Sequence, residues 1–82
     1  MTVASLRETI LTISVRLRSL GRLSGAGALD SAAAVVSSPQ EELLAMREAL
    51  VLTAPDWQSG DGDLSAVGRR ALAEAKRLAI RF

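Results

Sequence analysis

A row of apolar residues near the amino end sets the strongest limit on how this chain can fold. Its members follow one another at steps of four and three positions, which at about 100° per residue aligns them along one side of an α-helix. They are Leu6, Ile10, Ile13, Leu17 and Leu20. A second apolar row, on roughly the opposite side, comprises Ala4, Leu11 and Val15. A helix that is apolar on two sides needs cover on both. We therefore expect a central helix over residues 5–20, covered by later helices on one side and open to another chain on the other.

Two local signals bear on this first helix. Residues 11–18 alternate apolar and polar side chains and include β-branched ones, which is typical of a strand. We favour the helix because the apolar row extends beyond this window on both sides and no convincing second strand exists to pair with it. Ser5 and Glu8 have the spacing of a capping box, which predicts that the helix begins near Ser5.

The segment after the first helix holds three glycines between Gly21 and Gly27, which predicts a flexible connector. We expect Asp30 to cap a short helix over residues 31–37. The Asp30-Ser31 pair resembles the serine attachment site of acyl carrier proteins, which would imply a helical carrier domain. No leucine follows Ser31 here, so capping is the preferred role of this pair.

The clearest boundary in the chain precedes the next helix, which we expect over residues 39–53. Ser38 suits the N-cap, Pro39 suits the first helical position, and Glu41 completes a second capping box. Leu52 is an apolar residue on the acidic side of this helix, which makes it a candidate contact residue.

Residues 56–63 are acidic, and we expect them to form a turn that caps the last helix. A calcium loop of the EF-hand type is the alternative. Aligning Gly62 with the invariant glycine of that loop places Trp57 and Gly68 where carboxylates are needed, so the turn is preferred. Trp57 is the one tryptophan of the chain. It either folds back over the end of the helices or anchors an interface, since tryptophan is enriched at binding hot spots.

The last helix, expected over residues 64–81, has two contrasting sides. One side is lined by small residues, which allow another helix to approach closely. The other side carries the basic residues Arg69, Arg70, Lys76, Arg77 and Arg81, with Ile80 among them. A basic side of this kind is a candidate for contacts with nucleic acid phosphates.

The residue types that the chain lacks exclude most kinds of chemistry. None of its 82 residues is Cys, His or Tyr, which removes thiolate metal sites, the commonest general base and the best nucleophile. Catalysis by this chain alone is therefore not expected, nor is a bound metal or cofactor.

Charge and apolar content point instead to association. Residues 39–66 hold six carboxylates and one arginine, whereas residues 67–82 hold five basic side chains and one carboxylate. Such opposite charges can be satisfied within one folded chain or between two copies. Apolar residues make up 49% of a chain too short to bury much of its surface, which favours an oligomer or a subunit of a larger assembly. No run reaches the ~20 apolar residues that span a bilayer, and a cytoplasmic location is expected by default.

We therefore predict a single all-α domain over residues 1–82, a small helical bundle of three main helices plus one short helix. The predicted function is a non-catalytic protein-interaction module that self-associates or docks on a larger partner through apolar helix faces. The predicted contact residues are Leu11, Val15, Leu52, Trp57 and Ile80. The alternative is a nucleic-acid-binding accessory protein that uses the basic side of the last helix.

Overall fold

Helices account for nearly all of the structure. The computed structural model describes residues 2–59 and 62–80, which are 86% helical and contain no strand. In chain order the helices are α1 (Val3–Ser19), α2 (Leu23–Ala33), α3 (Pro39–Leu52), α4 (Ala54–Gln58) and α5 (Gly62–Ile80). The prediction of an all-α fold is confirmed for the described residues, although they form five helices where four were expected.

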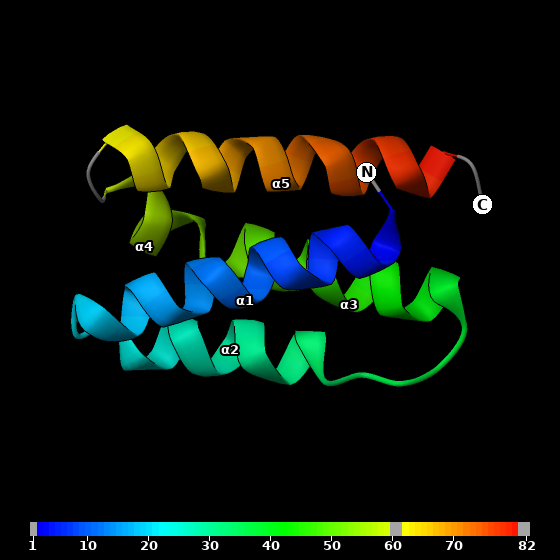
Figure 1. The fold of residues 1–82 in the computed structure, drawn as a ribbon, viewed down its shortest axis with the longest axis horizontal. Coiled ribbons are helices and arrows are strands. Elements are labelled where there is room, and N and C mark those ends of the chain that lie inside the picture. Colours follow the sequence, from blue (N-terminus) through cyan, green and yellow to red (C-terminus); the bar gives the residue numbers. More distant parts are fainter. Residues whose placement is uncertain (1, 60–61, 81–82) are drawn as a thin grey trace.

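The four longer helices lie along the long axis of the molecule and alternate in direction (Figure 1). α1 contacts each of the other four helices, and so does α3. α2 and α5 lie on opposite sides of α1, and the short α4 follows α3 and packs on α5 (Figure 1). The fold measures 33 × 21 × 18 Å, and its Cα radius of gyration of 11.5 Å is close to the ~12 Å expected of a compact chain of this length.

The apolar row of α1 forms the centre of the core. Leu6, Ile10, Ile13 and Leu17 are fully buried, as their spacing predicts. Leu20 departs from the prediction because it is the C-cap residue of α1, where the helix ends and the side chain becomes exposed.

α1 begins earlier than the predicted helix over residues 5–20. Thr2 is its N-cap, and the Thr2 hydroxyl oxygen accepts the backbone N–H of Ser5 at 3.1 Å. Ser5 therefore lies inside the first turn, and the predicted capping box of Ser5 and Glu8 is wrong. The cause is a second hydroxyl residue three positions upstream, which caps a longer helix.

The glycine-rich segment ends α1 but is not a flexible connector. Gly21 has φ +79°, and the N–H of Arg22 donates to the Leu17 carbonyl oxygen at 2.8 Å. This is the Schellman arrangement that terminates a helix, and it favours glycine at the position of positive φ. α2 follows at once, so the predicted short helix over residues 31–37 is wrong at both ends.

α2 forms despite a composition that favours helix weakly. A glycine in a helix interior costs about 1 kcal/mol relative to alanine, and contacts with α1 and α3 offset that cost. Gly25 is buried, and a Cβ added there would lie 2.5 Å from a carboxylate oxygen of Asp56 in α4. Asp30 and Ser31 lie inside α2, so neither caps a helix.

α3 begins where the sequence predicts. Pro39 is its first residue, and the Ser38 hydroxyl oxygen accepts the N–H of Glu41 at 3.3 Å. The helix ends at Leu52, one residue before the predicted boundary. The last helix, α5, begins at Gly62, two residues before its predicted start.

Trp57 is a core residue of this fold. Part of the segment predicted as an acidic turn, residues 56–63, folds as α4, and residues 60 and 61 lie outside the described part of the chain. The Trp57 side chain is fully buried, and its indole N–H donates to the Leu50 carbonyl oxygen at 3.1 Å. Its ring lies against Gly68 of α5, where an added Cβ would meet the indole Cε3 at 2.3 Å. The structure thus places Trp57 among the helices, which leaves it no surface to offer as an interface anchor.

The contact between Trp57 and Gly68 predicts the effect of a single methyl group. We expect Gly68→Ala to lower the free energy of unfolding by about 1–3 kcal/mol, because the new Cβ overlaps the fully buried Trp57 ring and one of the two must shift. Urea titration followed by the fluorescence of the one tryptophan measures this change.

Gly27→Ala is the matched control for this substitution. Gly27 also lies within a helix, but an added Cβ there has no neighbour within 4 Å. We expect this variant to be about 0.5–1 kcal/mol more stable, because alanine is the better helix former. Equal effects at the two glycines would contradict the close packing of α5 on Trp57.

Candidate interaction surfaces

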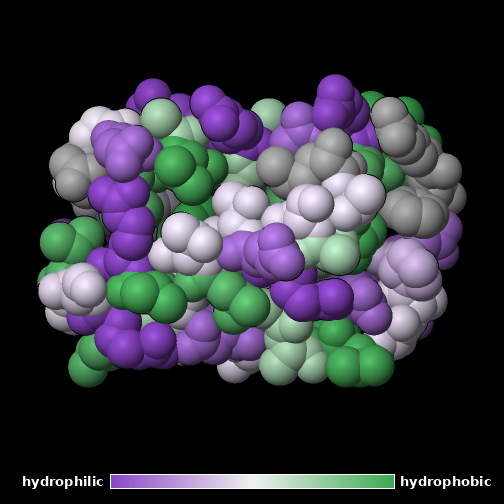
Figure 2. All heavy atoms as spheres, in the orientation of Figure 1, coloured by the Kyte–Doolittle hydropathy of each residue, from purple (hydrophilic) through white to green (hydrophobic). Residues whose placement is uncertain are grey.

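The outer side of α1 carries an exposed apolar pair, Leu11 and Val15. Their side chains are 41% and 60% exposed, and they lie one helical turn apart, away from the buried row. Ala4 extends the row and is also exposed. On the face shown in Figure 2, where α1 lies in front, apolar side chains stand among polar ones rather than in one large patch. The exposed apolar surface of α1 is therefore a narrow strip.

The other predicted contact residues lie on different helices. Leu52 at the end of α3 is 75% exposed, and Ile80 at the end of α5 is 85% exposed. Leu52 lines a shallow hollow formed with residues of α2 and α4, and neither Leu11 nor Val15 is among the described residues that line it.

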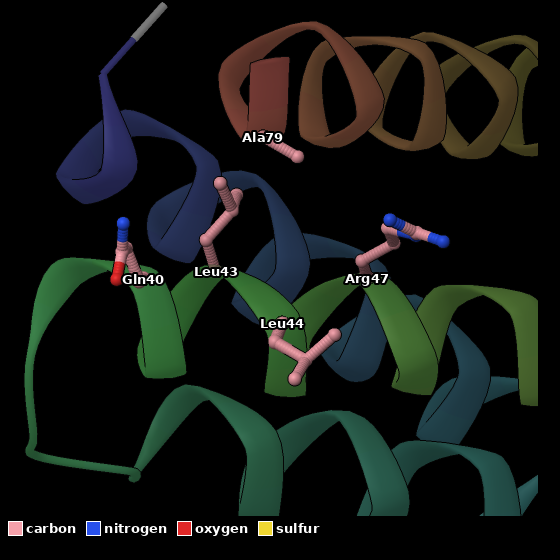
Figure 3. A pocket seen from close by; sticks show the side chains of 5 residues that line it. All are labelled: Gln40, Leu43, Leu44, Arg47 and Ala79. Atoms are coloured by element: carbon pink, nitrogen blue, oxygen red, sulfur yellow. The ribbon is translucent and has the colours of Figure 1, made fainter. Parts of the chain in front are cut away.

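A groove between α3 and α5 has no counterpart among the predicted sites. It has a volume of about 230 Å³ and is lined by Gln40, Leu43, Leu44, Arg47 and Ala79. We call it the α3–α5 groove. Leu43 and Arg47 project from α3 toward α5, and Ala79 faces them from α5 (Figure 3). Sequence reasoning missed it because its two walls are far apart in the chain. The one sequence feature that pointed to this surface was Leu44, an apolar residue next to the buried side of its helix.

The exposed side of α5 is basic over the described residues. We call Arg69, Arg70, Lys76 and Arg77 the α5 basic face, and all four are exposed. Arg77 pairs with Glu74, whereas the other three have no ion-pair partner among the described residues. Arg81, the fifth predicted phosphate contact, lies outside those residues.

Helical register divides the α5 basic face into two edges. Asp63 of α5 pairs with Arg16 of α1 at 2.9 Å, so this edge of α5 faces α1. Positions seven and fourteen residues later lie near the same edge, because seven residues make almost two full turns. Those positions are Arg70 and Arg77. The other edge, which borders the groove at Ala79, carries Arg69 and Lys76.

Acids from the central part of the chain form ion pairs with amino-terminal arginines. The pairs are Arg7–Glu42 at 2.6 Å, Arg16–Asp63 at 2.9 Å and Arg22–Asp56 at 3.6 Å. Each pair holds α1, or the residues just after it, against a later helix. The opposite charges of the chain are thus partly satisfied within it, and the α5 basic face keeps most of its charge uncompensated.

A buried polar contact joins α1 to α2. Ser14 is fully buried, and its hydroxyl donates to one carboxylate oxygen of Asp30. Arg18 donates to the other oxygen of the same carboxylate. The Ser14 hydroxyl, and then the Arg18 guanidinium, hold the pKa of Asp30 below its usual value of 3.8. Asp30 therefore links two helices, and the neighbouring Ser31 is an exposed residue of α2.

Glu42 ties the connection between α2 and α3 to α1. Its carboxylate accepts the backbone N–H of Ser37 at 3.0 Å and a guanidinium N–H of Arg7 at 2.6 Å. Arg7 also donates to the Ala33 carbonyl oxygen at 3.0 Å. The Ser37 N–H, and then Arg7, lower the pKa of Glu42 from its usual value of 4.5.

Neither the structure nor the comparisons supply a recognised site. Within residues 2–59 and 62–80, no group of three or more His, Cys, Asp or Glu side chains is placed to hold a metal ion. No helix in these ranges combines the length and apolar character needed to cross a membrane. Comparison with known proteins found no matching family model, curated protein or solved structure.

The lowered pKa of Glu42 predicts how stability depends on pH. The folded chain holds this carboxyl proton less tightly than the unfolded chain does. The Glu42 carboxylate therefore contributes its full stabilisation at pH values above the usual pKa of 4.5. That stabilisation is lost as the pH falls through the lower pKa of the folded state. We expect Glu42→Gln to lower stability at neutral pH and to weaken the acid dependence below that value, measured by urea titration at several pH values.

Glu48→Gln provides the comparison for the pH experiment. It removes an exposed carboxylate of the same helix that has no ion pair among the described residues. Identical pH profiles for the two variants would show that the contacts of Glu42 with Ser37 and Arg7 do not stabilise the fold.

Proposed function

We propose that this chain is a non-catalytic protein-interaction module that self-associates or docks on a larger partner. The observation that carries the proposal is the exposed pair Leu11 and Val15 on α1, the helix of the buried central row. Single exposed apolar residues are common on proteins, but two on one helix side, one turn apart, form a continuous strip. A partner laid along α1 would remove this strip from water, which is the main driving force for association.

The chemistry of the remaining side chains supports binding rather than catalysis. The chain has no His, Cys or Tyr to act as a base or nucleophile. The buried hydroxyl of Ser14 is engaged with Asp30 between two helices. The surface offers mainly apolar side chains and fixed charges, and Leu52 and Ile80 add to its exposed apolar area.

Substitution on the outer side of α1 tests this proposal. Leu11→Glu combined with Val15→Glu places two charges on the strip, and we expect it to abolish association. The free energy of unfolding should change by about 0.5 kcal/mol or less, because both side chains are already exposed. Association is measured by light scattering over a concentration series and by photo-crosslinking from position 8, on the same side of α1.

Ser31→Glu, which adds a charge to an exposed position of α2, is the control for this experiment. A mass of two or more chains in solution means that another copy covers the strip. A monomer that crosslinks to a different protein from position 8 means that the chain docks on that protein. If the double substitution leaves both association and crosslinking unchanged, the strip on α1 is not the contact surface.

Nucleic acid binding is the second candidate function, and the α5 basic face is the observation that favours it. Three of its four cations have no ion-pair partner among the described residues. Exposed cations of this kind can neutralise phosphates and release counterions, so such binding weakens steeply as salt rises.

A salt series with a DNA duplex tests the second candidate. If the α5 basic face binds phosphates, the logarithm of the binding constant falls with the logarithm of salt concentration by about 0.9 for each phosphate neutralised. Arg69→Gln with Arg70→Gln should then reduce both the affinity and this slope. Arg22→Gln, which removes a cation already paired with Asp56, is the control. Absence of a mobility shift at low salt would exclude this function.

A further inference from the structure

We propose that the α3–α5 groove binds an acidic amphipathic helix of a partner protein. The apolar side chains of that helix would lie on the groove floor, and its carboxylates would meet cations on the groove edges. This inference rests on the proposed interaction function and assigns a partner chemistry to a second surface, distinct from the outer side of α1.

The groove offers apolar surface in a shape that suits the side chains of a helix. Its apolar lining comes from Leu43 and Leu44 of α3 and from Ala79 of α5. Leu43 is 2% exposed, whereas Leu44 is 50% exposed and projects away from α5, at the outer margin of the groove (Figure 3). Its volume of about 230 Å³ is below the ~300–1,000 Å³ typical of small-molecule sites. A groove between two packed helices instead suits a third helix that inserts individual side chains into it.

One cation lines the groove from α3, and two more lie along the neighbouring edge of α5, before Ala79. Arg47 lines it from α3 and projects toward α5 (Figure 3). On α5, Lys76 lies about one turn before Ala79, and Arg69 lies about two turns before Lys76. Arg47, Arg69 and Lys76 are exposed and have no ion-pair partner among the described residues. All three are therefore available to a carboxylate of a partner.

The acids of α3 form no ion pair with these cations among the described residues. At about 100° per residue, Glu41 and Glu48 lie one turn from Leu44, on its side away from Arg47. Among the described residues that line the groove there is no carboxylate. The one charged side chain in that described lining is therefore the cation Arg47.

Exposed apolar residues extend this surface along both helices. Val51 follows Leu44 by seven positions on α3 and is half exposed. On α5, Ala73 and Ile80 are also seven positions apart and exposed. Seven-residue spacing keeps side chains on one line of a helix, as in the seam where helices pack together. A partner helix with apolar residues at i, i+3 or i+4, and i+7 has the same spacing as these lines.

Two other occupants match these observations less well. A nucleic acid backbone would be attracted to the cations but would gain little from the exposed Leu44 and Val51. A second copy docked groove against groove would bring Arg47, Arg69 and Lys76 of both chains together, and like charges at an interface oppose association. An acidic helix uses both the charge and the apolar surface.

Fluorescence anisotropy with defined peptides tests the proposal. The probe is a labelled peptide of about 18 residues, long enough to span ~27 Å as a helix, with Leu at i, i+3 or i+4, and i+7 and Glu on both flanks. Three comparison ligands separate charge from pattern: the same composition in scrambled order, the peptide with Lys in place of Glu, and a single-stranded DNA oligonucleotide. We expect saturable binding of the acidic amphipathic peptide and at least about tenfold weaker binding of the others.

Matched charge reversals on α5 locate the binding site. We expect Lys76→Glu, on the groove edge, to weaken peptide binding about fivefold or more. Arg70→Glu makes the same change of charge on the edge that faces α1, and we expect a change of less than about twofold. Both side chains are exposed, so both variants should fold.

Three results would each overturn the proposal: no binding of the acidic peptide, equal binding of the scrambled peptide or the oligonucleotide, or equal effects of Lys76→Glu and Arg70→Glu. Equal binding of the oligonucleotide would assign the cations to nucleic acid instead. Failure here is distinguishable from failure of the proposed function, because crosslinking from position 8 reports on the outer side of α1 and does not involve the groove.

Discussion

The buried row of α1 determines where the other helices can lie. Leu6, Ile10, Ile13 and Leu17 are fully buried on a helix that contacts all four others. At about 1.5–3 kcal/mol for each such side chain removed from water, this row supplies a large share of the stabilisation open to a small chain. The later helices are held where they cover it, and the outer side of α1 is what they leave uncovered.

Trp57 extends this core to the helices that follow. Helices shorter than ~12–15 residues are marginal on their own in water, so the five-residue α4 depends on tertiary contacts. Its tryptophan provides them, because the indole N–H bonds to Leu50 at the end of α3 and the ring lies on Gly68 of α5. One side chain therefore sets both the direction of the chain after α3 and the distance at which α5 can pack.

Sequence patterns predicted the elements that carry a strong local signal. α1 and α3 were expected from apolar periodicity, and Ser38 and Pro39 marked the start of α3. The start of α2 was missed because Gly25 and Gly27 lower helix propensity and indicate a connector, and the close packing around Gly25 that offsets this cost arises only in three dimensions. Leu11 and Val15 lie on the exposed side of α1, where the second apolar row places them. The sequence left two roles open for Trp57, because its burial depends on contact with Gly68 of another helix. The α3–α5 groove joins two distant segments, so no local pattern could reveal it.

The charge left on α5 follows from the same packing. α5 approaches its neighbours through small residues such as Gly68 and Ala75, so its long charged side chains lie on the opposite side. The central acids Glu42, Asp56 and Asp63 pair with arginines of the amino-terminal segment, because α1 and the turn after it lie beside the helices that carry them. No described carboxylate pairs with the cations next to the groove. Uncompensated like charges destabilise a compact chain through repulsion, and an anionic partner at the groove would relieve that repulsion while covering the apolar floor beside it.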